Sequence, residues 1–363
     1  MKPPEHVVVA MSGGVDSSVA ASILVEQGFS VTGLFMRLGH PTVEAAEADG
    51  PCGKGCCSAG DAADARFVAG RLEIPFFALN FHDDFDRIIE YFVDEYTQGR
   101  TPNPCILCNE FLKFGRLFDY ARAIGADAVA TGHYARIDAT ANGANLHRAV
   151  DQAKDQSYVL FGLRRDLLGR IRFPIGHLTK DQVRRHAERL GLPVHDKPDS
   201  SDICFVPDRD YSRLVRERRP SAFVPGDVVD ADDRIVGRHE GIPSYTVGQR
   251  RGLGIAMGSP MYVTAIDPEA NRITLGPKMA LLRAGLIASR VRWLTDEPAD
   301  VVRADVQIRY AHQATPATVE PLSGNRVCVR FDMPQPAVTP GQAAVFYQGD
   351  RVLGGGWIDA SLC

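Results

Sequence analysis

The chain has 363 residues, of which 45% are hydrophobic and 24% are charged. These proportions are typical of a globular protein, and the length allows about two or three domains. No apolar run approaches ~18 residues, so no membrane span is expected. Met1–Glu5 lacks the apolar segment of a secretory signal. Eight cysteines then indicate a reducing compartment, where thiols are more often reactive or metal-bound than paired in structural disulfides. We therefore expect a cytoplasmic protein without a membrane partner.

The net charge of −4 does not favour nucleic acid as a partner for the molecule as a whole. The acidic excess lies within residues 1–210, however, and the rest of the chain holds local basic clusters. Such a cluster is usually a solvated face, but it can also contact the phosphates of RNA. The clusters are Arg213, Arg216, Arg218 and Arg219, and the pair Arg250 and Arg251.

The first predicted strand, at residues 6–11, leads directly into the loop Ser12–Ser18, with the sequence SGGVDSS. A predicted helix over 16–27 follows and ends at Gly28. A strand, a Gly-Gly turn and a helix N-terminus together form an anion site, because glycine allows close backbone approach and the helix dipole favours negative charge. The alternative is a glycine turn with a Ser or Asp helix cap. The flanking elements favour an anion site, and the expected anion is the pyrophosphate end of ATP.

Short apolar runs alternate with helical stretches up to about residue 206, which predicts an α/β fold with a doubly wound parallel sheet. Ligands are expected at the C-terminal ends of its strands. The predicted strands are 6–11, 30–36, 75–80 and 126–131, and the predicted helices are 16–27, 60–72, 83–97, 109–124 and 179–190.

The pattern changes after Pro207. Residues 222–280 consist of short apolar runs broken by glycine and proline, which predicts a small β-rich structure. Residues 285–363 alternate apolar and polar side chains, which predicts an antiparallel β-barrel or sandwich. We therefore expect a nucleotide-binding catalytic domain over 1–207, a small central domain over 208–280 and a C-terminal β-barrel domain over 281–363.

A second informative segment is the loop Thr101–Asn109, which contains two prolines and the pair Cys105 and Cys108. The helical pattern that follows predicts a helix that begins near Cys108. A thiol at a helix N-terminus has its thiolate stabilised, so we expect its pKa to fall below about 8.5 and the thiol to be nucleophilic. A Cys-Xaa-Xaa-Cys pair is otherwise half of a metal site, a redox pair or a coincidence. The chain has no second pair with zinc spacing, which disfavours a four-cysteine zinc site.

The remaining cysteines carry less information. Cys204 lies in the polar segment Asp199–Phe205, where an inert buried thiol is the default interpretation. The cluster Cys52, Cys56 and Cys57 allows a metal or sulfur-relay role, but a mobile insert near the active site is the simpler interpretation. Cys328 and Cys363 have no expected role.

The loop Ser12–Ser18 lacks the Gly-Lys-Ser/Thr ending of a Walker A motif and resembles the PP-loop of ATP pyrophosphatases. Several longer motifs follow it in a fixed order, and together they resemble the bacterial tRNA-specific 2-thiouridylase family over nearly the whole chain. These motifs are Pro102–Asn109, Ala130–Tyr134, Lys154–Tyr158, Ile203–Phe205 and Val247–Gly254.

The resemblance implies the site residues. Cys108 falls on the family's catalytic nucleophile and Cys204 on its persulfide-bearing cysteine. In the PP-loop Ser12 and Ser17 would hold pyrophosphate, and Asp16 would help to position Mg²⁺. The implied nucleotide-binding residues are Ala10, Met11, Ser12, Gly13, Gly14, Val15, Asp16, Ser17, Met36 and Gly132.

The resemblance also implies contacts with tRNA. The target base would meet Asn103, Pro104 and Cys105, and the rest of the tRNA would meet His133, Lys154, Asp155, Gln156, Arg309, Tyr310 and Gln342. The chain departs from the family pattern at two places. Many members have aspartate at the position of Cys105, so this residue could be a spare thiol or a cluster ligand. Many also have Thr-Gly at the position of Ser201-Asp202, and a carboxylate there would raise the pKa of the Cys204 thiol.

The implied activity is ATP-dependent thiolation of the wobble uridine, with ATP and Mg²⁺ as cofactors. Its partners would be tRNA and a sulfur-donor protein, either a cysteine desulfurase or a relay. Two alternatives remain open. One is an amide-forming PP-loop synthetase, which needs no cysteine pair and no tRNA. The other is an RNA-binding protein whose Cys105, Cys108 and Cys204 ligate an iron–sulfur cluster, which could also coexist with thiolation.

Overall fold

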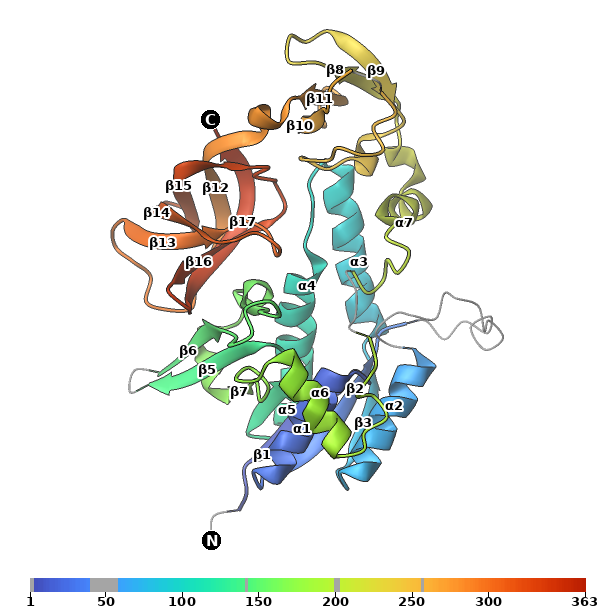
Figure 1. Ribbon diagram of the computed structural model, residues 1–363, viewed down its shortest axis with the longest axis vertical. Coiled ribbons are helices and arrows are strands. Elements are labelled where there is room, and N and C mark those ends of the chain that lie inside the picture. Colours follow the sequence, from blue (N-terminus) through green and yellow to red (C-terminus); the bar gives the residue numbers. More distant parts are fainter. Residues whose placement is uncertain (1–2, 40–57, 141–142, 199–202, 256–257) are drawn as a thin grey trace. The chain divides into compact units, whose positions relative to one another are not determined.

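The computed structural model describes residues 3–39, 58–140, 143–198, 203–255 and 258–363. The chain forms two compact units, whose elements are labelled in Figure 1. The first unit comprises Met1–Ile88, Cys105–Arg209 and Asp350–Val352, and the second comprises Ile89–Pro104, Asp210–Gly349 and Leu353–Cys363. No helix among the described residues is long and apolar enough to cross a membrane.

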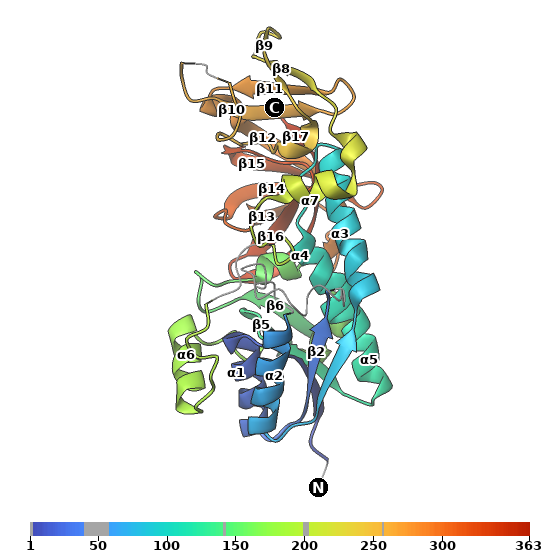
Figure 2. The same ribbon diagram turned by 90° about the vertical axis from the view of Figure 1, so that its right-hand side faces the viewer.

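The first unit is built on a parallel sheet with the strand order β3-β2-β1-β4-β7. Figure 2 shows α1 and α2 on one side of this sheet and α5 on the other, which confirms the predicted doubly wound α/β fold. The strands are β1 (His6–Ala10), β2 (Ser30–Arg37), β3 (Phe76–Asn80), β4 (Ala128–Thr131) and β7 (Ile171–Arg172).

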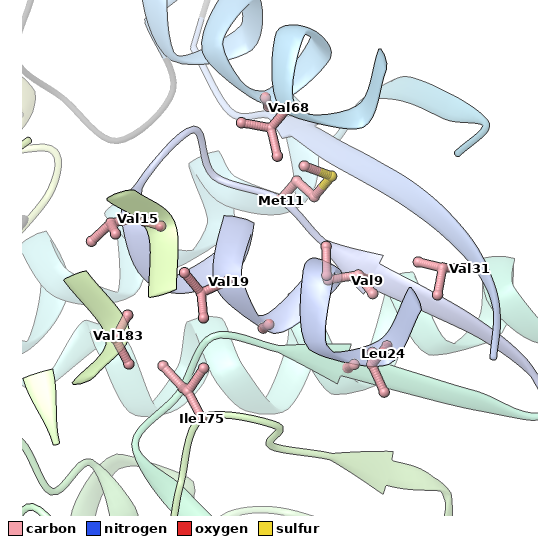
Figure 3. Packing of buried hydrophobic residues seen from close by; sticks show 14 of the residues in the cluster. Val9, Met11, Val15, Val19, Leu24, Val31, Val68, Ile175 and Val183 are labelled. Carbon is pink, nitrogen blue, oxygen red and sulfur yellow. The ribbon is translucent and has the colours of Figure 1, made fainter. Parts of the chain in front are cut away.

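The core of this unit lies between β1 and the helices α1 (Val15–Glu26), α2 (Ala59–Arg71) and α6 (Lys180–Arg189). Figure 3 shows Val9 of β1 and Met11, which directly follows the strand, in the same apolar cluster as Val19 and Leu24 of α1. Val8, on the opposite face of the strand, is also fully buried. Burial on both faces explains why β1 is a continuous apolar run rather than an alternating one.

The helix that follows the proline loop begins earlier than the sequence predicts. It starts at Pro104 and continues without a break through α4 (Pro104–Leu107), the π-helical segment η2 (Cys108–Arg116) and α5 (Leu117–Ala123). Proline suits the first helical position because its missing N–H needs no partner there. Cys105 therefore occupies the first turn and Cys108 the second, so the prediction that the helix begins near Cys108 is wrong.

The hairpin of β5 (Ala135–Thr140) and β6 (Gly143–Arg148) has no counterpart in the sequence prediction. It leads into two short 3₁₀ helices, η3 (Ser157–Leu160) and η4 (Arg165–Arg170). Its strand β6 pairs with Arg351 at the start of β17.

The second unit contains the end of α3 (His82–Thr97), α7 (Tyr211–Arg218) and a four-stranded sheet of order β10-β11-β8-β9. This sheet confirms the β-rich structure predicted for residues 222–280. Its strands are β8 (Gly226–Val229), β9 (Ile235–His239), β10 (Tyr262–Asp267) and β11 (Arg272–Gly276), and the 3₁₀ helices of the unit are η5 (Pro220–Ala222), η6 (Ile242–Ser244) and η7 (Lys278–Leu281).

The C-terminal strands form a closed antiparallel barrel in the order β12-β15-β14-β13-β16-β17, and pairing of β12 with β17 closes it. Side chains that alternate inward, among them Val306, Val329 and Phe346, fill its interior. The predicted β-barrel is thus confirmed. The strands are β12 (Leu282–Trp293), β13 (Val302–Gln307), β14 (Thr315–Leu322), β15 (Arg326–Pro336), β16 (Ala343–Gln348) and β17 (Arg351–Leu362).

Candidate active site

The loop between β1 and α1 has the geometry of an anion cradle. The Ser17 hydroxyl accepts a hydrogen bond from the Ser12 backbone N–H at 3.1 Å and donates one to the Gly14 carbonyl at 3.2 Å. Gly14, the N-cap residue of α1, makes no side-chain cap. By contrast, α2 and α6, the other helices of this core, each begin with a complete capping box. The first N–H groups of α1 are therefore left for an outside acceptor, as an anion site requires.

Two glycines in and beside this loop are required by close packing. Gly13 has φ +73°, and a Cβ there would lie 2.2 Å from the Asp61 carbonyl oxygen. A Cβ at Gly132, which follows β4, would lie 2.6 Å from both the Asp16 carbonyl carbon and the Ser17 nitrogen. Gly132 thus allows the segment after β4 to contact the backbone at the start of α1 directly. Two parts of the predicted nucleotide site that are far apart in the sequence, Gly132 and the loop Ser12–Ser18, meet in this way.

Asp16, the residue predicted to position Mg²⁺, already has a cationic partner. The ammonium of Lys180, in the first turn of α6, donates to both carboxylate oxygens at 2.8 Å. The Tyr134 hydroxyl donates to Asp16 Oδ1, also at 2.8 Å. Lys180 is buried and lies 5.7 Å from the Tyr134 ring centroid. Sequence reasoning missed Lys180, and the one signal it offered was a lysine in the first turn of a helix, where the dipole disfavours a cation.

A second lysine, Lys197, also bonds to the loop between β1 and α1. Lys197 donates to Asp61 at 2.6 Å, to Asp64 at 2.7 Å and to the carbonyl oxygen of Gly13 at 3.0 Å. Burial alone would lower the pKa of Lys197, but its hydrogen bonds to the two carboxylates outweigh that effect and raise it. The ammonium therefore stays charged and ties the first turn of α2 to the loop. No sequence motif pointed to this residue.

The donors around Asp16 suit a metal that arrives with the nucleotide. Mg²⁺ is commonly held by one or two protein carboxylates together with substrate phosphates, and Asp16 with the Ser12 and Ser17 hydroxyls offers such a partial set. Among the described residues, no three cysteine, histidine or carboxylate side chains are grouped to hold a metal alone. Cys105, Cys108 and Cys204 therefore do not form a ready-made cluster site in this structure.

Cys108 is held by the packing of its helix. The next residue, Asn109, is buried, and its side-chain amide donates to the Val159 carbonyl at 2.9 Å. Cys108 itself is half-buried, while Cys105 is exposed. Because the effect of the dipole fades beyond the first turn, the helix N-terminus favours a thiolate at Cys105 more than at Cys108.

Cys204 is also half-buried and belongs to the same compact unit as Cys108. The following residue, Phe205, packs edge-on against Phe85 of α3 with a centroid distance of 5.7 Å. The cluster Cys52, Cys56 and Cys57 and the Ser201-Asp202 pair lie outside the described residues, so the expectations for them stay untested.

His133, predicted to contact tRNA, is buried. Its Nδ1 lies 2.6 Å from the Thr131 hydroxyl, and its Nε2 lies 3.3 Å from the ammonium of Lys113. Burial, and then the Lys113 cation, hold the pKa of His133 well below its usual range. The ring is therefore neutral, and Nε2 accepts from Lys113 while Nδ1–H faces Thr131. A direct contact between this ring and RNA would require the ring to be uncovered.

In the predicted tRNA-contacting segment Lys154–Gln156, the side chains of Asp155 and Gln156 bond within the protein. Asp155 accepts from Arg148 at 3.1 Å and from the Ser157 hydroxyl at 2.7 Å. The Gln156 side chain accepts from the Tyr134 backbone N–H at 2.9 Å. Asp155 thus ties the end of β6 to the start of η3, and Gln156 braces the backbone at Tyr134. Their predicted contact with tRNA remains a prediction.

The predicted residues of the second unit lie on the barrel and the proline loop. Tyr310 is 48% exposed, and its carbonyl, like that of Arg309, accepts from the Gln307 amide. Gln342 donates to the Thr101 carbonyl at 2.9 Å, two residues before Asn103. In the first unit Met36, half-buried, lies near the C-terminal end of β2.

The basic cluster at α7 is partly neutralised by acidic neighbours. Arg218 and Arg219 each pair with Glu90 of α3 at 2.5 Å, and Arg219 also pairs with Asp94 at 3.1 Å. Arg213 also lies near Glu217 of the same helix, and Arg216 lies near Glu240. Arg218 and Arg219 thus hold the end of α7 to α3, which weakens the case that these two arginines bind phosphate. Arg250 and Arg251 are exposed.

Three family models match the chain. The tRNA methyl transferase HUP domain matches residues 5–208, the tRNA methyl transferase PRC-barrel domain matches 213–277, and the Aminomethyltransferase beta-barrel domain matches 283–358. The small sheet is thus a PRC-barrel domain that lies between the parallel-sheet domain and the closed barrel in the chain.

Relatives match over the full length. The tRNA-specific 2-thiouridylase MnmA of Geobacter metallireducens is 49% identical over 363 residues, which cover 99% of this chain and 98% of that protein. The protein of the same name from Chloroflexus aggregans is 50% identical over 356 residues, which cover 97% of this chain and 98% of that protein. The similarity therefore runs through all three matched regions rather than through the nucleotide-binding part alone.

Proposed function

This chain belongs to the tRNA-specific 2-thiouridylase family, and we propose that it uses ATP to replace the C2 oxygen of the wobble uridine of tRNA with sulfur. The observation that carries the proposal is the uncapped start of α1, framed by Gly13 and Gly132 and flanked by Asp16 and Lys180. That arrangement suits the binding of pyrophosphate, which ATP releases when an oxygen nucleophile attacks its α-phosphate.

The first step is activation of the base. The C2 oxygen attacks the α-phosphorus of ATP, the bond to the β-phosphate oxygen breaks, and pyrophosphate leaves. Backbone N–H groups of the loop and the Lys180 ammonium are placed to stabilise the departing charge. Mg²⁺ at Asp16 would supply further charge stabilisation when bound. The product is an O-adenylated base with AMP as a good leaving group.

The second step is sulfur transfer. Cys204 carries a persulfide, whose terminal sulfur attacks C2 and expels AMP. The Cys108 thiolate then attacks the inner sulfur, the sulfur–sulfur bond of the persulfide breaks, and a Cys108–Cys204 disulfide forms as 2-thiouridine is released. Alternatively, Cys108 attacks the persulfide first and frees hydrosulfide, which then attacks C2. Either route ends with an oxidised cysteine pair that an external thiol must reduce.

The proposal includes partners and location. The sulfur donor is a persulfide-bearing protein, either a cysteine desulfurase or a relay, and the tRNA presents its anticodon loop, where an unstacked base is easily reached. Dependence on a reducible cysteine pair fits a cytoplasmic location.

Reconstitution tests the function. Purified protein, ATP, Mg²⁺, a desulfurase with cysteine and unmodified tRNA should yield 2-thiouridine, detected by nucleoside mass spectrometry. Cys108→Ser and Cys204→Ser should each abolish the product while they retain tRNA-dependent pyrophosphate release, because adenylation precedes sulfur transfer. Asp16→Ala should lose pyrophosphate release as well.

The same assay separates the alternatives. ATP turnover that does not require tRNA would favour an amide-forming synthetase. A brown, oxygen-sensitive protein with visible absorbance after anaerobic purification would indicate an iron–sulfur cluster. Normal thiolation by both serine variants would refute the assigned cysteine chemistry.

A further inference from the structure

A turn of the β-barrel holds the backbone of the proline loop. The Thr101 N–H donates to the Pro340 carbonyl at 2.9 Å. The side-chain amide of Gln342 donates to the Thr101 carbonyl at 2.9 Å and to the Pro102 carbonyl at 3.4 Å. Both polar backbone groups of Thr101 are therefore paired with this turn. We call Pro340–Gln342 the clamp turn.

The close approach of the two segments requires glycine in the middle of the clamp turn. Gly341 has φ +89°, and a Cβ there would lie 2.8 Å from the Thr101 nitrogen and 3.0 Å from its oxygen. The turn is itself fixed, since the Gly341 N–H donates to the Ile358 carbonyl at 2.9 Å and the Ile358 N–H donates to the Gln342 carbonyl at 2.8 Å. The clamp turn is thus hydrogen-bonded to strand β17 through Ile358.

The residue before the loop is anchored to the same strand. Arg100 donates to Glu95 of α3 at 2.8 Å and to the Ile358 carbonyl at 3.4 Å, and it lies 3.8 Å from Asp359. The loop needs such outside support because Pro102 and Pro104 have no N–H to donate to it. All of these contacts lie within the second unit.

We propose that Gln342 is a positioning residue, which fixes the backbone of Thr101–Pro104 so that Asn103 and Pro104 meet the target base. The proposal rests on the proposed function for the identity of that base. The side-chain nitrogen of Gln342 faces two carbonyl oxygens of the loop, Thr101 O at 2.9 Å and Pro102 O at 3.4 Å. Gln342 therefore acts on the reaction through the loop, and the clamp turn makes the barrel part of the base-binding machinery.

Gln342→Glu tests the proposal with little change in shape. The carboxylate cannot donate and would face two carbonyl oxygens, so the loop should loosen. At saturating tRNA we expect the single-turnover rate of adenylation to fall about 10–100-fold, as misplacement of reacting groups by about 1 Å does elsewhere. The Kd for tRNA should change less than threefold. Hydrogen exchange at the Thr101 and Gly341 amides should become faster.

Gln348→Glu is the matched control, because it places the same charge at an exposed site on the barrel strand β16. It should leave the rate, the exchange at Thr101 and the melting temperature at wild-type values. A variant Gln342→Glu with weaker tRNA binding, an unchanged rate at saturation and unchanged exchange would overturn the proposal and make Gln342 an RNA contact. If the wild-type protein does not modify tRNA, the proposed function fails, while the exchange measurements still test the clamp turn alone.

Discussion

At the scale of single residues, Lys180 is the main addition to the site. Removal of its ammonium takes away the cation that pairs with Asp16 and leaves the hydrogen bond from the Tyr134 hydroxyl. The uncompensated carboxylate would then repel the phosphates of the nucleotide. We expect Lys180→Met to weaken ATP binding without Mg²⁺ by about tenfold, which corresponds to about 1.4 kcal/mol. Titration calorimetry with ATP and with pyrophosphate measures this. Lys278→Met, which changes an exposed lysine, is the control, and equal affinities for the two variants would contradict the role given to Lys180.

His133 predicts a pH dependence of stability. Its pKa in the folded protein lies well below 6.5 because of burial and the nearby Lys113, whereas the unfolded chain titrates near 6.5. Below that pH the unfolded state binds the extra proton, so folding is destabilised as pH falls, by up to about 1.4 kcal/mol per pH unit for one group. His133→Asn should flatten the dependence of the unfolding free energy on pH between 7 and 5 by roughly that slope. His177→Asn, at an exposed position, should keep the wild-type slope, and an identical slope in both variants would rule out this role for His133.

At the scale of elements, periodicity was sufficient to predict α1, α2, α3, α6 and the central strands, because each buries one side or both against apolar neighbours. The start of the helix at Pro104 was not predictable in the same way. Proline there fits a rigid loop and a first helical position equally well. The β5–β6 hairpin escaped prediction because its strands contain few of the β-branched and aromatic residues that mark strands.

The junction between β4 and α1 gives a prediction at this scale. In Gly132→Ala the added Cβ would lie 2.6 Å from backbone atoms of Asp16 and Ser17, neither of which is a flexible side-chain tip. We expect a loss of about 1–3 kcal/mol in the free energy of unfolding, as in other overpacked sites, and weaker ATP binding. Denaturant unfolding and calorimetry measure the two effects. Gly70→Ala, where a Cβ meets no atom within 4 Å, should be neutral or stabilising, and similar behaviour of the two variants would contradict the packing argument.

At the scale of the whole molecule, some residues of the candidate site lie in recognisable sequence motifs, and others come together only in the folded chain. The PP-loop, Cys108 and Cys204 stand in recognisable segments. Lys180 is 164 residues from Asp16 and Lys197 is 136 residues from Asp61, so neither ion pair leaves a local pattern. The arginines at α7 are the opposite case, a local pattern that misleads. Their spacing predicts a basic patch, but Glu90 and Asp94 of α3 neutralise part of it in the folded chain.

We infer that binding of tRNA to this acidic chain depends on other cations as well, and Arg250 and Arg251 are candidates because both are exposed. We expect Arg250→Glu and Arg251→Glu each to weaken tRNA binding and to reduce the slope of log K against log salt by about 0.7–0.9 per lost phosphate contact. Filter binding between low and high salt measures this. Arg213→Glu, which makes the same charge change next to Glu217, should weaken tRNA binding less. A larger loss of binding in Arg213→Glu would instead indicate that α7 contacts the phosphates.

The way the chain threads through the molecule limits how it can be divided. It leaves the first unit after Ile88, returns at Cys105, leaves again after Arg209 and returns briefly for Asp350–Val352. A fragment that stops at Arg209 would thus keep Ile89–Thr97 of α3 without the rest of the second unit, and it would lose Arg351, with which β6 pairs. Because each unit is built from separate stretches of the chain, we expect a single cut in the sequence to leave both units incomplete, so fusions and truncations of this protein should keep the whole chain.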